Sequence, residues 1–373
     1  MAETRRAIEL HAVVQALVQA LVIDPIRMPA RRRPVRLACF LLLLGLATCR
    51  GGCGKKAAPP ASPAGALDWF PADTRIVVGV DFARLRATTL WAQLGSLATT
   101  DPSDRQKIDE LASRTGFDPL KQVDSLIVAF PEEARAQGGM GMLLRGRGLD
   151  ENRLIAYVRD QVTKQGDDLF SFRHAGRTLW ATKKEPTTAG FFLDSTTFVL
   201  GTGGWAERMA ELSASPPGPS SANATGNLPL AHLVDRAGPA RAIWAAAIVP
   251  AATRSALAAD PALPGAANVN RLALGIDLSS GVDAHLLADL STHAEAEDMA
   301  RQVGEAVLAA KRSPQVLLMG VGPSLDGVTA KATDVTCEVG VRLSPAQASD
   351  GVDRLKALLS LARQGAVPGF PHP

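Results

Sequence analysis

Hydrophobic and polar positions along the chain follow the periods of both strands and helices and predict a mixed α+β protein. An apolar run at residues 75–80 has the length of a buried strand, and Asp81 suits the start of a helix that runs to Leu94. The elements that follow alternate between helices, paired strands and two hairpins. They are a helix at 103–114, strands at 123–130 and 141–148, a helix at 149–162, hairpins pairing 169–172 with 178–182 and 191–193 with 198–201, and a helix at 205–212.

The second half of the chain repeats this order, which predicts two related units in tandem. Strands at 241–249, 270–278 and 282–290 precede a helix at 292–310; strands at 316–319, 328–332 and 336–343 and a final helix from Ser344 to Leu361 follow. We expect two α+β domains, at residues 67–212 and 228–364, each a mainly antiparallel sheet covered by helices. Their β-α-β-β-α-β order also fits a ferredoxin-like arrangement. The polar, proline-rich segment 213–227 is the expected linker, and residues 365–373 form a tail.

The beginning of the chain has the pattern of an export signal. Arginines at 31–36 precede an apolar run at 37–49, which is shorter than the roughly 18–20 residues that span a bilayer as a helix. We therefore interpret residues 28–48 as a signal peptide that begins at Met28. Residues 1–27 then form an upstream extension outside the fold, and residues 49–66, rich in Gly, Pro and Ala, form a flexible tether.

The end of the apolar run, Leu46-Ala47-Thr48-Cys49, resembles the lipobox of bacterial lipoproteins. This resemblance implies that the Cys49 thiol carries a diglyceride and that the mature protein is anchored in a membrane by its acyl chains, palmitate among them. Thr48 departs from the small residue usual before the cysteine. Cys53, which follows Gly52, is therefore the alternative lipidation site, and an ordinary signal peptide with free thiols is the other alternative.

Charge and cysteine content narrow the classes of protein. The formal net charge is +3, but the first 48 residues hold seven basic and three acidic side chains, so the remainder carries a net charge of −1. This balance argues against a nucleic-acid-binding protein, which would carry a basic face. Four cysteines in 373 residues exclude a disulfide scaffold.

Candidate chemistry is sparse. The six histidines form no metal-binding spacing, and no G-x-S-x-G motif is present, so we expect no catalytic residue, no metal and no cofactor. The one polar turn cluster consists of His174, Asp194 and Ser195, which lie on neighbouring hairpin turns. Ser and Asp are also ordinary turn residues. Gly201-Thr-Gly-Gly204 is expected to be a tight strand-to-helix turn, and Cys337 a buried apolar residue.

The opening strand follows the sequence Pro71-Ala-Asp-Thr74, and here the body is similar to uncharacterised lipoproteins of high-GC bacteria, in which a "PADT" strand leads a tandem α+β body. That resemblance implies no activity. We expect an exported, lipid-anchored cell-envelope protein, in the outer membrane and facing the periplasm or the surface. Its expected role is that of a non-enzymatic binding or scaffold module. The alternatives are an envelope hydrolase, which a hydrogen bond between His174 and Ser195 would favour, and a carrier of a lipid or other apolar ligand.

Overall fold

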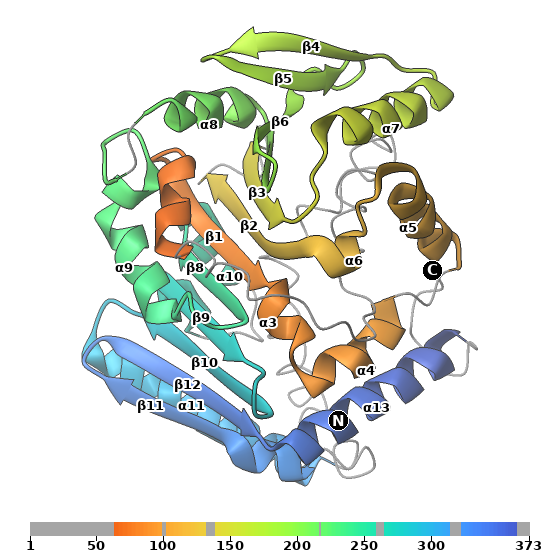
Figure 1. Ribbon diagram of the computed structural model, residues 1–373. Coiled ribbons are helices and arrows are strands. Elements are labelled where there is room, and N and C mark those ends of the chain that lie inside the picture. The colour runs from red at the N-terminus through yellow and green to blue at the C-terminus, as the bar shows by residue number, and fades with distance from the viewer. Residues whose placement is uncertain are drawn as a thin grey trace.

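The computed structural model describes residues 63–98, 102–131, 139–215, 218–258, 265–313 and 322–363. Their strands form one antiparallel sheet of twelve strands in the order β11-β12-β10-β9-β8-β1-β2-β3-β7-β6-β5-β4 (Figure 1). The strands are β1 (Thr74–Asp81), β2 (Val123–Pro131), β3 (Met140–Gly146), β4 (Leu169–His174), β5 (Arg177–Thr182), β6 (Thr188–Asp194), β7 (Thr197–Thr202), β8 (Ile243–Ile248), β9 (Arg271–Asp277), β10 (Val282–Asp289), β11 (Val328–Thr333) and β12 (Thr336–Leu343).

The sheet bends, so that β4 and β5 lie at one end and β11 and β12 at the other, and helices cover both of its faces (Figure 1). We call the face under α8 and α9 the outer face and the opposite one the inner face. The helical elements are η4 (Pro63–Trp69), α3 (Phe82–Arg86), α4 (Thr89–Ala98), α5 (Pro102–Thr115), α6 (Pro119–Gln122), α7 (Glu151–Lys164), α8 (Trp205–Ser213), η5 (Ala224–Gly226), α9 (Leu228–Ala237), α10 (Ala251–Ala258), η6 (Ala266–Asn268), α11 (His293–Arg312), η7 (Gly322–Gly327) and α13 (Pro345–Arg363).

Helix starts follow local capping chemistry. Asp81 and Asp150 accept hydrogen bonds from backbone N–H groups in the first turns of α3 and α7, and Thr292 and Glu295 form a reciprocal capping box on α11. One expected helix, from 82 to 94, is divided into α3 and α4. The division falls at Thr88, whose hydroxyl accepts a hydrogen bond from the Trp91 N–H and so starts a second helix. Both predicted hairpins are confirmed.

The two halves of the chain meet in this single sheet. β1 pairs antiparallel with β8, and Val78 lies directly opposite Ala245. The structure therefore shows one continuous sheet, and it does not show two tandem units. The ferredoxin-like order is wrong, because a split β-α-β unit places a third strand between two parallel ones. Here β1 and β2 are direct antiparallel neighbours.

The Pro71–Thr74 segment is a clamp at the start of β1. The Thr74 hydroxyl, fully buried, donates to the Pro71 carbonyl over 2.5 Å, and Asp73 forms a two-pronged ion pair with Arg208 of α8. Pro71 also pairs as an isolated bridge with Asn223. The Asn223 side chain accepts hydrogen bonds from Ser220 N–H and Gly226 N–H, so residues 218–227 of the expected linker are tied to the core.

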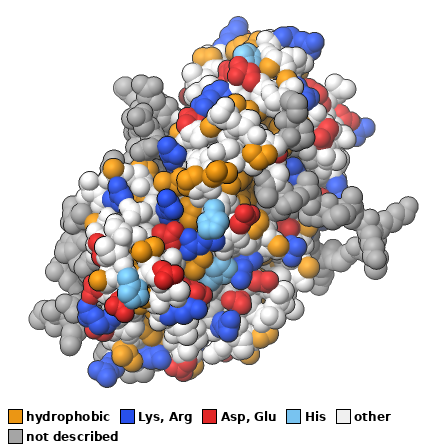
Figure 2. Space-filling view, turned by 90° about the vertical axis from the view of Figure 1, so that its left-hand side faces the viewer, with side chains coloured by type: hydrophobic (Ala, Val, Ile, Leu, Met, Phe, Trp, Pro, Cys, Tyr) orange, Lys and Arg blue, Asp and Glu red, His pale blue; other side chains and the backbone are white. Residues whose placement is uncertain are grey.

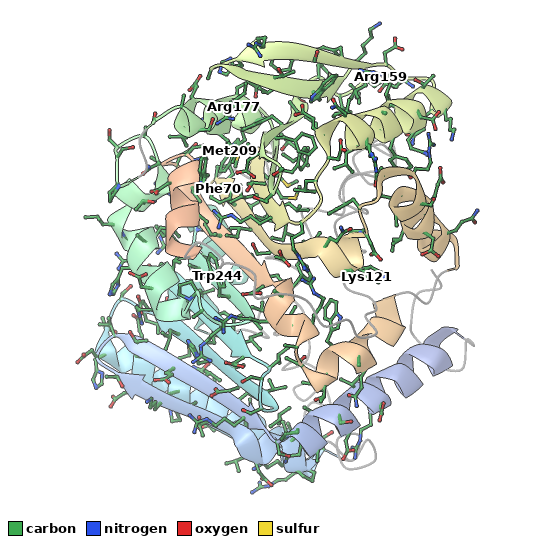
Figure 3. The ribbon with its side chains drawn as sticks, viewed as in Figure 1. Phe70, Lys121, Arg159, Arg177, Met209 and Trp244 are labelled. Carbon is green, nitrogen blue, oxygen red and sulfur yellow. The ribbon has the colours of Figure 1, made fainter. Side chains whose placement is uncertain are left out.

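The core on the outer face is continuous across the sheet centre. Phe70 and Met209 lie close together between the α8 side and the sheet, and Trp244 lies further along the same core (Figure 3). All three are at most 2% exposed, as are Leu230 and Leu233 of α9. On the surface of this side, acidic and basic side chains are interspersed (Figure 2), so they form no single-sign patch there.

Several predictions concern residues outside the described ranges. These are the leader, its extension, residues 49–62 of the tether with Cys49 and Cys53, the strand at 316–319 and the tail. The last four residues of the expected tether are not flexible, because 63–66 belong to η4 and Ala66 is fully buried in the core on the outer face. Within the described ranges, no helix combines the length and the apolar character needed to cross a bilayer.

Candidate functional site

Apolar side chains form an unbroken row along the inner face of the sheet. Residues directly opposite each other in antiparallel strands point to the same face, so the strand registers define this row. We call it the inner row. Its members, from β7 to β11, are Leu200, Met142, Val128, Val78, Ala245, Leu274, Leu286, Val339 and Ala330.

Ala245 at the centre of the inner row is buried, at 9% exposed, but the residues beside it are less covered. Val78, Leu274 and Leu286 are all partly exposed, whereas their neighbours on the outer face are covered: Val77 and Ala273 are 0% exposed. Among the described helices that pack on the inner face, α3 and α6 contact β2 near the centre of the sheet, and α11 contacts β11 and β12 at one end. The inner row therefore presents partly uncovered apolar surface between these helices.

Two apolar clusters border this surface. One joins Phe82 of α3 and Trp91 of α4, whose rings meet edge to face at 6.2 Å, to Ile243 of β8. The other joins Cys337 of β12 to Ala296 of α11. Both clusters extend the apolar character of the inner row, so an apolar molecule on the row would meet few polar side chains.

The far rim of the inner face is formed by α4 and α13. These helices come from opposite ends of the described chain and contact each other, and Gln93 Nε2 donates to Ser349 Oγ over 2.6 Å. On α13, Ala348 is 5% exposed. The contact between α4 and α13 therefore closes the α4 side of the inner face.

The polar turn cluster is only partly brought together. Asp194 and Ser195 line an open hollow of about 710 Å³ at the start of α7, together with Arg147, Gly148, Leu149, Asp150, Glu151, Phe192, Leu193 and Thr196. Partial burial raises the pKa of Asp194, but hydrogen bonds from Thr196 and Thr197 outweigh this and hold that pKa below its ordinary value. The described hydrogen bonds of Asp194 therefore lie within its own turn and stabilise that turn.

The described contact of His174 is with Glu211 and not with the polar turn at Asp194-Ser195. Its Nε2 lies 2.9 Å from Glu211 Oε1 on α8, and no described hydrogen bond joins it to Ser195. Two other histidines contact backbone carbonyls: His285 Nε2 lies 3.3 Å from Arg236 O, and His293 Nδ1 lies 2.6 Å from Asp334 O. Within the described residues, no three His, Cys, Asp or Glu side chains gather as metal ligands.

The remaining candidates have structural explanations. A Cβ on Gly201 would overlap the backbone of Ala206, so this glycine permits the close turn from β7 into α8. Cys337 is fully buried, as expected, and burial raises the pKa of its thiol. Sequence reasoning missed the inner row. Its signal was present as alternate apolar positions in each strand, but only the strand order joins them.

Comparison with known proteins identifies no family for this chain. No protein-family model matches the chain, and no curated protein sequence matches it. Among solved structures, the chain is similar to crystal form I of TP0453, with a TM-score of 0.38 and 9% identity over 81% of this chain and 99% of that one. We draw no function from a likeness at that level.

Proposed function

We propose that this protein is a lipid-anchored component of the cell envelope that binds an apolar ligand along the inner row. The anchor is argued from the lipobox-like Leu46–Cys49 sequence, and the ligand from the partly exposed apolar surface. Among the roles considered from the sequence, the alternative of a carrier of a lipid or other apolar ligand is the one that this geometry supports best.

The observation that carries the proposal is the contrast between the two faces of the same strands. In β9, Leu274 of the inner row is partly exposed, whereas its neighbour Ala273 on the outer face is 0% exposed. In β10, Leu286 lies in the inner row, and Leu287, which is also partly exposed, packs against the core on the outer face. Burying a leucine side chain contributes about 1.5–3 kcal/mol, so a strip of partly exposed aliphatic residues gains free energy when an apolar molecule covers it. A long acyl chain has the shape and chemistry for such a strip.

The hydrolase alternative lacks a described contact that would support it. A serine nucleophile needs a base within hydrogen-bond reach, and the described contact of His174 is with Glu211 rather than with Ser195. The scaffold alternative would leave the inner row without a role. For these reasons we favour the apolar ligand.

The test uses cis-parinaric acid, a fluorescent fatty acid, and two matched variants in β10. Leu286→Asn places an amide in the inner row, and Leu287→Asn places the same amide on the outer face. We expect Leu286→Asn to weaken binding at least about tenfold, because a polar group in an apolar site costs on the order of 1–3 kcal/mol.

Leu287→Asn should leave the affinity within about twofold of that of the unaltered protein. Its amide destabilises the fold by a comparable amount, but it lies on the outer face and does not contact the ligand. Equal weakening by both variants would place the probe elsewhere. An unaltered protein that shows no saturable fluorescence increase would overturn the apolar-ligand proposal outright.

A further inference from the structure

Strand β11 is the last strand at one side of the described sheet, and no described strand pairs with its outer edge. It pairs only with β12 among the described strands, and Thr333 lies opposite Thr336 across the turn at Asp334-Val335. Hydrogen-bonded and non-hydrogen-bonded pairs alternate away from such a turn. Val328, Ala330 and Ala332 therefore direct their N–H and C=O groups away from β12, toward this outer edge.

This edge has few of the features that prevent strand addition. Its sequence, Val-Thr-Ala-Lys-Ala-Thr, contains no proline, and its pairing with β12 has no bulge. Its one charged residue, Lys331, bonds through Nζ to Glu338 of β12 at 3.0 Å. The opposite edge, β4, ends in Arg173 and His174. The two edges of the sheet are thus unequal, and β11 is the one suited to pairing.

We propose that a second copy of this chain adds to β11, so that the two β11 strands pair antiparallel about Ala330. In this register Ala330 faces itself, Val328 faces Ala332 of the second copy, and Thr329 faces Lys331 of the second copy. No two like charges stand opposite each other, so the strand is complementary to itself. A two-fold axis closes the contact and continues the sheet across both copies.

Helix α11 offers a second contact beside this edge. It packs on the sheet through Ala296, Val307 and Ala310, and among the described helices it covers β11 and β12 on the inner face. Gly304 and Leu308 lie one turn apart on a flank of this helix. Leu308 is 54% exposed, and a Cβ on Gly304 would meet open space.

The direction of α11 sets which side this flank faces. The helix starts beside the β11–β12 turn, where His293 contacts Asp334, and ends beside Asp326, which pairs with Lys311. For a right-handed helix of 3.6 residues per turn running in this direction, the Gly304–Leu308 flank lies over the outer edge of β11 rather than over β10. In the paired form the two α11 helices would meet along these small and apolar positions.

The proposal is tested by sedimentation velocity across a concentration series. The protein is the full exported chain carrying Cys49→Ser and Cys53→Ser, which keeps every described residue and removes acylation. We expect a reversible dimer. Ala330→Pro removes an outward N–H that β12 does not use, so the fold is retained. Loss of the central pair of hydrogen bonds should raise the dimer dissociation constant at least about 30-fold.

Two further variants make the result specific. Ser171→Pro places the same change at an outward position of β4, the other edge, and should leave the dissociation constant within about threefold. Leu308→Glu should raise it by about tenfold, since burial of an exposed leucine is lost. Circular dichroism checks that each variant is folded.

A chain that stays monomeric up to the highest concentration overturns the proposal. So does a dimer that Ser171→Pro weakens as much as Ala330→Pro, since that dimer would not form through β11. Hydrogen exchange gives a third readout: the amides of Val328, Ala330 and Ala332 should be protected only in the dimer. Protection in a dilute monomer would mean that the chain covers its own edge.

Discussion

Trp244 lies directly across from Gly79 at the junction of β8 and β1, and its indole ring occupies the space where a Cβ on Gly79 would stand. Trp244 is 2% exposed and belongs to the core on the outer face. The junction that unites the two halves of the chain thus depends on a glycine in one half and a tryptophan in the other.

Gly79→Ala is expected to lower the free energy of unfolding by about 2–3 kcal/mol, because the added methyl group forces the indole out of its position. Urea denaturation measures the effect. Trp244→Leu also destabilises the protein, but in the double variant the two losses should fall short of their sum by at least about 1 kcal/mol. Strict additivity would show that the ring and the glycine do not interact. Gly351→Ala, on an exposed helical position of α13, is the control and should not destabilise.

Asp289 is expected to control the acid limb of the stability curve. Burial raises its pKa, but hydrogen bonds from Arg236, at 2.7 Å, and Thr336, at 2.8 Å, outweigh burial, so the folded pKa lies below the ordinary 3.8. A lowered folded pKa means that the stabilisation is present above pH 3.8 and is lost as the pH falls through the folded value.

Asp289→Asn should therefore lower the free energy of unfolding at pH 7 by about 2 kcal/mol and flatten its decline below pH 4. Urea titrations from pH 3 to pH 7 compare the two proteins. Parallel curves for the unaltered protein and Asp289→Asn would contradict the assignment.

Asn223 should hold the segment between the two halves in place. Its side chain accepts from Ser220 and Gly226 and donates to the Gly218 carbonyl over 2.8 Å. Asn223→Ala is expected to cost about 1–2 kcal/mol and to open residues 218–227 to limited proteolysis. The Ser221→Ala variant is changed at an exposed neighbouring residue, and the protease should cleave it at the same rate as the unaltered protein. Equal cleavage of both variants would mean that the hydrogen bonds of the Asn223 side chain do not hold this segment in place.

Cys49 is predicted to carry the acyl chains. Radiolabelled palmitate should be incorporated by the unaltered protein and by Cys53→Ser, and lost in Cys49→Ser, because the thiol of the lipobox cysteine is the acylated group. Label retained in Cys49→Ser but lost in Cys53→Ser would move the anchor to Cys53. Label absent from the unaltered protein would leave an ordinary signal peptide.

Local elements were predictable because their causes are local. Side-chain periodicity and turn chemistry within a few residues predict the hairpins around Ala175-Gly176 and Asp194-Ser195, the capped starts at Asp81, Asp150 and Thr292, and the strands β8 to β12 of the second half. The break at Thr88 was missed, because a threonine in a helical pattern can either continue the helix or cap a new one.

The sequence by itself determined the α+β class, the alternation of strands and helices in both halves and the export signal pattern at the start. Only the tertiary structure decided that β1 pairs with β8 and that both halves share one sheet, because strand order depends on contacts between residues such as Val78 and Ala245, far apart in the chain. The same order creates the inner row. Each strand supplies only one of its apolar side chains, and the row that they form exists only once the strands stand side by side.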